Sequence, residues 1–170
     1  GPQFGARYSA ENFTIEEMKT WVDYCHLYGV DVHVTVNTLV KEKEIESLKE
    51  YLKQLNKIGV DALIVQDIGA AEIIKKTVPD MTLHASTQMT VTSLEGVKYL
   101  EDMGFSRVVL ARELSEKEIE HICKNAKAEI EVFVHGAICM CYSGQCLMSS
   151  ILGGRSGNRG RCAQPCRLPY

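Results

Sequence analysis

Several features that mark other protein classes are missing from this 170-residue sequence. No apolar run approaches the roughly 20 residues that a membrane-spanning helix needs. The first residues also lack the charged segment followed by an apolar segment that marks a secretory signal peptide. We therefore expect a cytoplasmic protein with no membrane partner.

Motifs of three large enzyme classes are absent as well. There is no G-x-G-x-x-G loop of a dinucleotide-binding fold, no H-E-x-x-H zinc helix and no G-x-S-x-G nucleophile turn. His135 and Cys139 could form a catalytic cysteine–histidine pair. A nucleophilic thiol, however, needs one base and one orienting group rather than several neighbouring thiols. Mechanism alone therefore disfavours proteolysis.

Acidic residues are absent from the last part of the chain. All 22 aspartates and glutamates lie at or before Glu131, whereas Arg155, Arg159, Arg161 and Arg167 follow it. Four arginines without neighbouring carboxylates suit contact with phosphate, carboxylate or nucleic acid. An exposed polar loop would explain the same composition. Few aromatic residues accompany these arginines, so an RNA-stacking surface has little support from the sequence.

Short runs rich in valine, isoleucine and leucine alternate with amphipathic segments. The predicted strands are residues 30–37, 62–66, 81–85, 107–111 and 130–135. The predicted helices are residues 15–27, 42–58, 70–77, 94–103 and 116–125. Two helices begin with capping-box pairs, Thr14 with Glu17 and Ser115 with Glu118. Such alternation with short connections predicts a parallel sheet covered by helices.

Glycines mark the ends of three predicted helices. Gly29, Gly59 and Gly104 each stand between a helical segment and the next strand. Glycine adopts the left-handed conformation that ends many helices, so these positions support repeated strand–helix units.

Polar residues gather after the predicted strands: Asn37, Gln66, Asp67, His84, Ser86, Gln88, Arg112, Glu113 and His135. A (β/α)₈ barrel has its active site at the carboxyl ends of its strands, and an open parallel sheet binds ligands at the same end. The missing dinucleotide motif favours the barrel. Because only five strands are visible, we predict an α/β fold that is a partial (β/α) barrel, like a TIM barrel, over residues 1–136. A Cys/Arg-rich segment, residues 137–170, is expected at its mouth.

A partial barrel leaves sheet edges unpaired. Unpaired strands tend to pair with other chains. We therefore expect the 170-residue chain to self-associate.

The mouth residues have structural and functional interpretations. Asn37 and Gln66 could satisfy backbone groups, and Arg112 could pair with Glu113. A histidine such as His84 is more often a hydrogen-bonded structural residue than a general base. The functional hypothesis assigns catalytic roles to His84, Arg112, Glu113 and His135, and substrate binding to Asn37, Gln66, Asp67, Ser86, Gln88, Arg155 and Arg161. A planar guanidinium at a strand end suits a carboxylate, which predicts a small anionic ligand.

Five of the seven cysteines crowd into one segment, at positions Cys139, Cys141, Cys146, Cys162 and Cys166. In a reducing compartment such a cluster suits metal or iron–sulfur ligation better than disulfides. Cys139, Cys146, Cys162 and Cys166 offer four soft ligands for a [4Fe–4S] cluster or a tetrahedral zinc ion. Cys141 is an extra thiol that could replace one of the four. The remaining two cysteines, Cys25 and Cys123, are expected to be ordinary buried thiols.

Several segments resemble the collagenase-like peptidases, peptidase family U32. They are the run from Glu131 to Cys139, the YSGQCLMSS segment around Cys146, the opening GPQFGAR, the internal HASTQM and LARELS, and the closing GNRGRCAQPCRLPY. The resemblance implies the N-terminal barrel-like part of a longer protein. It also implies two competing activities. One is peptide hydrolysis, and the other is oxygen-independent hydroxylation of transfer RNA, ribosomal RNA or a quinone precursor.

The resemblance to the hydroxylating members of the family also indicates which cofactors to expect. By resemblance, cysteines of this region hold an iron–sulfur cluster, and prephenate acts as a co-substrate of the RNA-hydroxylating members. Some members take one ligand from a more distant part of the chain, which makes Cys166 the least secure of the four. On this resemblance we favour the [4Fe–4S] cluster over zinc. We also favour hydroxylation of RNA or a small aromatic substrate over peptide hydrolysis.

Overall fold

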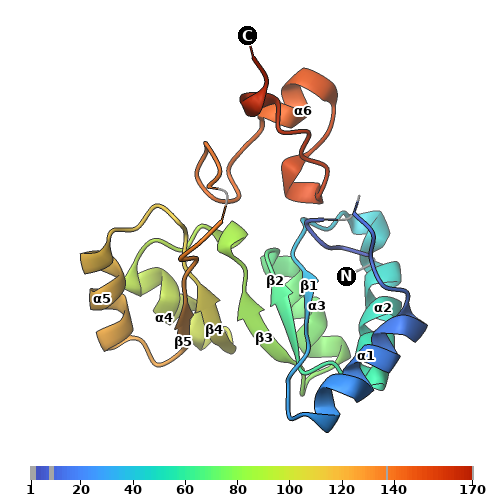
Figure 1. Cartoon of the computed structure of the whole chain (residues 1–170). Coiled ribbons are helices and arrows are strands. Elements are labelled where there is room, and N and C mark those ends of the chain that lie inside the picture. The colour runs from blue at the N-terminus through green and yellow to red at the C-terminus, as the bar shows by residue number, and fades with distance from the viewer. Residues whose placement is uncertain (1–2, 8–9, 137, 170) are drawn as a thin grey trace.

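The computed structural model describes residues 3–7, 10–136 and 138–169. Its centre is a five-stranded parallel sheet in the order β1-β2-β3-β4-β5 (Figure 1). The strands are β1 (His33–Val36), β2 (Ala62–Val65), β3 (Thr82–Ala85), β4 (Phe105–Val109) and β5 (Glu129–Glu131). The predicted α/β class and the parallel sheet are therefore confirmed.

Of the described helices, five alternate with the strands as predicted, and a sixth was not predicted. The five are α1 (Ile15–Leu27), α2 (Ile45–Ile58), α3 (Ile68–Thr77), α4 (Leu94–Asp102) and α5 (Glu116–Asn125), and the sixth is α6 (Met148–Gly153). Four short 3-10 turns, η1 (Glu42–Glu44), η2 (Thr87–Met89), η3 (Gly157–Arg159) and η4 (Pro165–Arg167), complete the described elements. Both predicted capping boxes are present, at Thr14 and Ser115. The three predicted glycines, Gly29, Gly59 and Gly104, have φ values of 66°, 85° and 83°.

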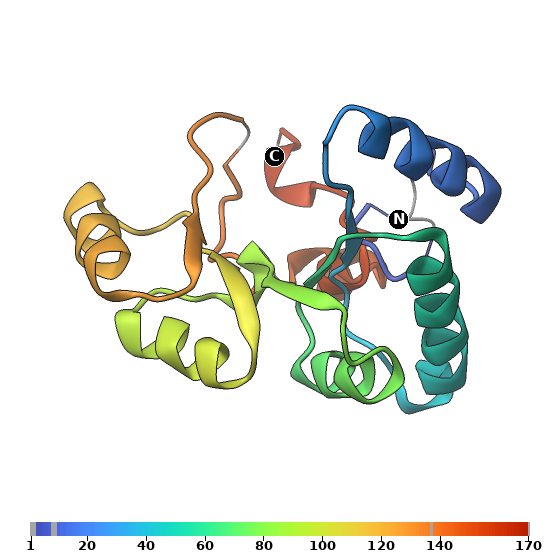
Figure 2. The same cartoon turned by 90° about the horizontal axis from the view of Figure 1, so that it is seen from below.

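The two faces of the sheet differ in character. Apolar side chains of one face, among them Val36, Leu63 and Val108, are fully buried with the apolar sides of the helices. The opposite face is partly polar, because the strand register places Ile64 of β2, His84 of β3 and Arg107 of β4 in one row. Figure 2 shows the strands as an arc with the helices along its outer side. This arrangement is consistent with part of a (β/α) barrel.

The last predicted strand is wrong at its carboxyl end. β5 stops at Glu131, and residues 132–135 leave the sheet as an exposed loop. The run Val132–Val134 has the composition of a strand, but its side chains find no layer to pack against. His135 therefore lies in a loop and not at a strand end.

Two further features bear on the sequence predictions. Cys25 is half-buried, but Cys123 on α5 is exposed, so the expectation of a buried thiol was wrong at Cys123. Within the described ranges, no helix combines the length and the apolar character needed to cross a bilayer.

Candidate functional site at the carboxyl edge of the sheet

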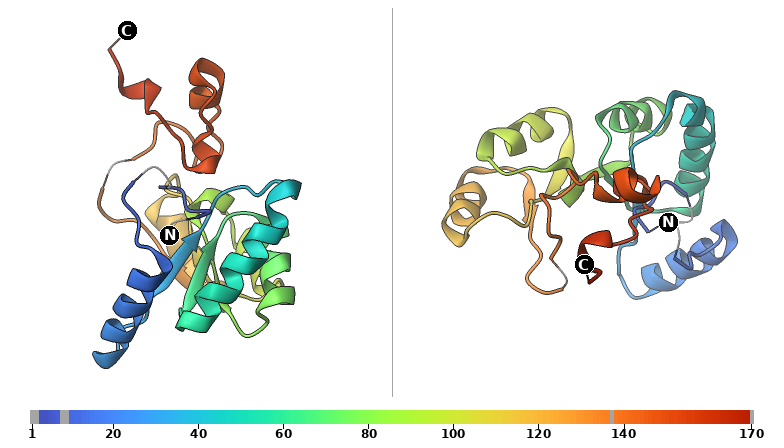
Figure 3. Two further views of the ribbon diagram at one scale, coloured as in Figure 1. Left: turned by 90° about the vertical axis from the view of Figure 1, so that its right-hand side faces the viewer. Right: turned by 90° about the horizontal axis from the view of Figure 1, so that it is seen from above.

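The cysteine-rich segment, residues 138–169, lies across the carboxyl ends of the strands (Figure 3, right). A loop of this segment docks on the connection between β3 and α4. Thr90 Oγ1 donates a hydrogen bond to the carbonyl oxygen of Ser143 at 2.5 Å, and Gln145 Nε2 donates to Thr90 Oγ1 at 2.9 Å. Between them, Gly144 has a φ of +76°, and a Cβ there would lie 2.1 Å from the carbonyl oxygen of Gln88. The docking thus requires glycine at this position.

The residues after β4 meet the same loop. The Glu113 carboxylate accepts a hydrogen bond from the backbone nitrogen of Ser143 at 3.1 Å, which ties the β4 end to the cysteine-rich segment. The guanidinium carbon of Arg112 lies 5.6 Å from the ring centre of Phe133, in a cation–π contact. Arg112, Phe133 and the exposed His135 line a small hollow of about 100 Å³. Three of the four predicted catalytic residues therefore share this region.

Structural contacts occupy several predicted substrate-binding residues. Asn37 accepts a hydrogen bond from the backbone of Ala6 at 2.9 Å and donates one to Ser86 Oγ at 3.3 Å. Asp67 caps α3 by accepting from the Ala70 nitrogen at 3.0 Å, and its other oxygen accepts from the Val40 nitrogen at 2.9 Å. These contacts favour the structural interpretation of Asn37 and Asp67.

Two glutamines differ from their neighbours. The Oε1 atoms of Gln66, after β2, and Gln88, after β3, are buried and accept no hydrogen bond from the described part of the chain. Gln66 is only 7% exposed. Buried acceptors are nearly always partnered, because an unpaired one costs the free energy of its lost hydration. These two carbonyl oxygens are therefore unpartnered acceptors of the described chain, and neither glutamine lines the hollow beside Arg112 and His135.

His84 lies inside β3, below the carboxyl edge, and not with the other predicted catalytic residues. It is 5% exposed, and its ring packs edge-on against that of His33 with centroids 4.7 Å apart. Burial, the neighbouring positive charge of Arg107 and His33 lower the pKa of His84 to about 4. His84 is therefore neutral at pH 7, and Arg107 is held by Glu129 at 2.6 Å.

Two of the cysteines are in direct contact. The Cys141 thiol is hydrogen-bonded to Cys146; burial first, and then the neighbouring Cys146 and Cys139, raise its pKa. Separately, Arg167 Nη2 donates to the carbonyl oxygen of Ile138 at 2.9 Å. This bond brings the chain next to Cys166 alongside the chain next to Cys139. Cys162 Sγ accepts a hydrogen bond from the Gln164 nitrogen at 3.4 Å.

The thiols have the right chemistry to bind an iron–sulfur cluster or zinc, but in the described residues they are not arranged around one point. Thiolates are the ligands that both groups prefer. In residues 3–7, 10–136 and 138–169, however, no three Cys, His, Asp or Glu side chains are placed so that they could share one metal ion. The close pair is Cys141 with Cys146, so Cys141 is a stronger candidate ligand than the sequence indicated.

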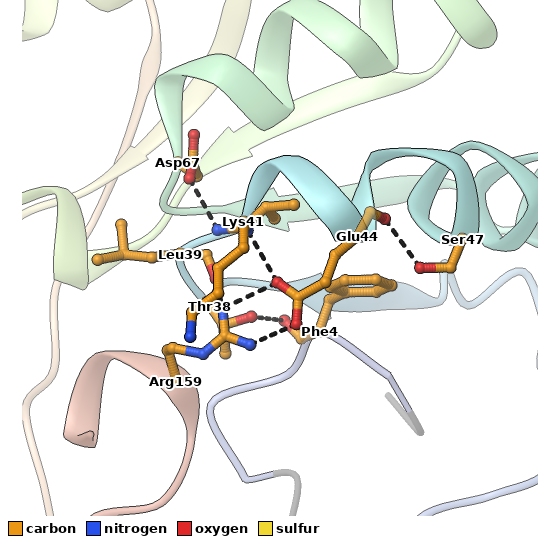
Figure 4. A network of polar contacts seen from close by, with 9 residues as sticks. Phe4, Thr38, Leu39, Lys41, Glu44, Ser47, Asp67 and Arg159 are labelled. Atoms are coloured by element: carbon orange, nitrogen blue, oxygen red, sulfur yellow. Dashed lines mark hydrogen bonds and ion pairs between the residues drawn. The ribbon is translucent and has the colours of Figure 1, made fainter. Parts of the chain in front are cut away.

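The four arginines of the segment have different environments. Arg159 forms an ion pair with Glu44, at 2.5 Å and 3.0 Å, and donates to the carbonyl oxygen of Leu39 at 2.7 Å (Figure 4). This ion pair lowers the pKa of Glu44 to about 2. The sequence-based expectation of an uncompensated charge is therefore wrong at Arg159. Its partner lies 115 residues away, so no local pattern could have revealed it.

The other predicted binding arginines are more open. Arg155 is exposed just after α6, and Arg161 is exposed at a hollow of about 450 Å³. Lys41, which the sequence analysis did not single out, lines the same hollow.

Comparisons with known proteins identify a matching family model and several similar proteins. The model of the family described as peptidase family U32 matches residues 1–170. A 23S rRNA 5-hydroxycytidine synthase of Escherichia coli (strain K12) is 46% identical over 170 residues, covering 100% of this chain and 25% of that protein. A tRNA hydroxylation protein of Bacillus subtilis (strain 168) is 38% identical, covering 100% of this chain and 40% of its own length. The chain thus spans between a quarter and two fifths of these relatives.

A solved structure supports the fold. The solved structure of the U32 peptidase Mk0906 matches with a TM-score of 0.61 and 23% sequence identity, covering 74% of this chain and 53% of that one.

Proposed function

Since this chain belongs to peptidase family U32, we propose that it forms the N-terminal part of an RNA-hydroxylating enzyme of the cytoplasm. The observation that carries the proposal is the 46% identity, over every residue of the chain, to a protein named for hydroxylation of a ribosomal RNA cytidine. The second relative is named for hydroxylation of transfer RNA. Hydroxylation of RNA is the activity that these two names share.

The same proposal assigns the architecture. Residues 1–136 form part of a (β/α) barrel, and residues 137–170 cover its mouth. The arc of parallel strands, the outer helices and the hydrogen bonds of Ser143 and Gln145 with Thr90 and Glu113 support this division.

The reaction site, in this proposal, lies between the strand ends and the cysteine-rich loop. Gln66 and Gln88 offer buried carbonyl oxygens, which suit the amino group of a cytosine base. Arg112 and His135 border the hollow of about 100 Å³ and would contact an anionic substrate group. His84 maintains the neutral inner face of the sheet and takes no proton at pH 7, because its pKa is about 4.

Cysteines of the segment would hold a [4Fe–4S] cluster, with ligands drawn from Cys139, Cys146, Cys162, Cys166 and the adjacent Cys141. When bound, such a cluster supplies one-electron transfer. The Cys141–Cys146 contact supports these two thiols as ligands, and the Arg167–Ile138 hydrogen bond brings the backbone beside Cys166 near the backbone beside Cys139. Anaerobic reconstitution of the full-length protein, followed by iron and sulfide analysis of each Cys→Ser variant, tests the assignment. Cys123→Ser, on exposed α5, is the matched control.

The experiment that tests the activity is a gene deletion. We expect the deletion to remove a nucleoside heavier by one oxygen atom from either the ribosomal or the transfer RNA, as measured by mass spectrometry of nucleosides from each RNA pool. Expression of the full-length gene should restore it. If both RNA pools are unchanged while the purified protein cleaves peptides, the chain belongs to a peptidase and the proposal is wrong.

A further inference from the structure

Three distant segments of the chain enclose the hollow of about 450 Å³ beside the end of β1. Its lining comes from residues 3–5, from residues 38–47 and from residues 159–161. Figure 4 shows Phe4, Thr38, Lys41, Glu44 and Arg159 converging there from these segments. The hollow is separate from the loop that contains Cys141 and Cys146.

Backbone contacts fix the walls of the hollow. The Leu39 nitrogen donates to the Asn158 carbonyl oxygen at 3.1 Å, and Arg159 returns a bond to the Leu39 carbonyl oxygen. At Gly160, whose φ is +72°, a Cβ would lie 2.6 Å from the carbonyl oxygen of Gly5. The arginine-bearing loop is therefore packed tightly against both other segments, and the hollow is a built feature of the fold.

The charge balance of the hollow is positive. Lys41, Arg159 and Arg161 line it together with a single carboxylate, that of Glu44, which gives +3 − 1 = +2. Glu44 stays ionised, because its pKa is about 2, and it is neutralised by Arg159. Within the described ranges, no carboxylate lies at ion-pair distance from Lys41 or Arg161.

The hydroxyl groups in the hollow already donate hydrogen bonds to backbone carbonyl oxygens. Thr38 Oγ1 donates to the Phe4 carbonyl oxygen at 3.0 Å, and Ser47 Oγ donates to the Glu44 carbonyl oxygen at 2.8 Å. The charged donors left for a ligand are thus Lys41 Nζ and the guanidinium of Arg161. An ammonium beside a planar guanidinium is a combination suited to phosphate oxygens.

We propose that this hollow binds a backbone phosphate of the RNA substrate through Lys41 and Arg161. The proposal rests on the proposed function and extends it by separating two roles among the arginines. Arg159 positions the loop, whereas Arg161 contacts the ligand. Phosphate contacts fix the register of a nucleic acid on a protein without reading its sequence. A phosphate held beside the end of β1 would orient the RNA strand toward the neighbouring strand ends.

The salt dependence of RNA binding tests this proposal. Each lost phosphate contact lowers the slope of log K against log salt by about 0.7 for single-stranded RNA. In the full-length protein, we expect Lys41→Gln and Arg161→Gln each to reduce the slope for transcribed tRNA and 23S rRNA. Because both residues contact the same phosphate, we expect the double variant to reduce the slope by about 0.7 in total and not by twice that amount. Lys57→Gln, an equal charge change at an exposed position of α2, should leave the slope unchanged.

Two controls complete the test. All variants should have the melting temperature of the parent protein, since neither side chain packs in the core. Inorganic phosphate serves as a second probe, because it should compete for the same two residues. If the double variant loses phosphate binding but keeps the parent salt slope, the hollow serves a small phosphorylated ligand and the RNA assignment is overturned. An unchanged slope together with unchanged phosphate binding overturns the site altogether.

The failure of this inference can be told from the failure of the proposed function. The salt slope measures binding alone, whereas the gene deletion measures the modified nucleoside. If the deletion removes the nucleoside but the salt slope is unchanged in the variants, the proposed function is supported and the phosphate site is contradicted.

Discussion

At the scale of single residues, two buried polar side chains near the strand ends affect the stability of the fold in different ways. His84 is buried in its neutral form against His33 and Arg107, which stabilises the fold only while the ring stays unprotonated. The carbonyl oxygen of Gln66 is buried without a donor, which costs stability unless a ligand supplies one. Both groups can be tested by substitution.

Stability should fall in mild acid because of His84. Its pKa is about 4 in the folded protein and about 6.5 in the unfolded chain, so the unfolded state binds more protons between these values. The free energy of unfolding is therefore unaffected above pH 7 and falls by about 2 kcal/mol between pH 7 and pH 5. Urea unfolding at the two pH values measures this. The variant His84→Gln should lack most of the difference, and an equal loss in the variant would refute the assignment to His84.

Replacing Gln66 by methionine should separate stability from activity. Methionine has a similar shape and no buried acceptor, so we expect the free energy of unfolding to rise by about 1–3 kcal/mol. RNA hydroxylation by the full-length protein should fall in the same variant, because the acceptor for the substrate is lost. Gln54→Met, at an exposed site on α2, is the control. A stable variant with full activity would show that Gln66 has no role in binding.

At the scale of elements, the cysteine-rich segment is joined to the sheet at separate places. Gly144 packs against the backbone that follows β3, and Ser143 is hydrogen-bonded to Glu113, which follows β4. Arg159 is paired with Glu44, between β1 and α2. These contacts join residues 30 to 115 positions apart, so the place of the segment depends on the tertiary fold and not on local structure.

The variant Gly144→Ala should detach the cysteine loop. Its Cβ would meet the Gln88 carbonyl oxygen, and its positive φ adds about 1–2 kcal/mol of strain. We expect Cys141 and Cys146 to react with a thiol reagent about tenfold faster or more, because 1.4 kcal/mol of local opening corresponds to a factor of ten. Gly153→Ala is the matched control, since no atom lies within 4 Å of its Cβ position. Equal labelling rates in both variants would show that Gly144 does not hold the loop.

At the scale of the whole molecule, the sheet is open. β1 and β5 are its edges, with no further strand beside either one in the described ranges. Beside β1, α1 and its C-cap residue expose a row of aromatic rings, Trp21, Tyr24 and Tyr28, with centroid distances of 5.8 Å and 5.1 Å. A hollow of about 510 Å³, with a mainly apolar lining, adjoins this row. Exposed edges and apolar patches favour association.

The 170-residue chain should therefore self-associate as its concentration rises, measured by light scattering during gel filtration. We expect the double substitution Trp21→Lys with Tyr28→Lys to lower the apparent association constant about tenfold or more, by placing charge on the row. Tyr99→Lys, an exposed aromatic residue on α4, is the control and should have little effect. A monomer at all concentrations would contradict the prediction.

Local patterns were sufficient for much of the fold and for part of the site. Capping boxes, helix-ending glycines and short apolar runs depend on neighbours a few residues apart, so the sequence by itself determined α1 to α5, most of the five strands and their parallel direction. The end of β5 and the short helix α6 were not predicted. It also pointed to the strand ends as the place of the polar residues. Only the tertiary structure decided which of these were engaged: Asp67 as a cap, Glu113 on Ser143 and Arg159 on Glu44. The physical reason is that a side chain's charge and hydrogen bonds depend on partners brought close by folding, and those partners leave no trace in the spacing of the sequence.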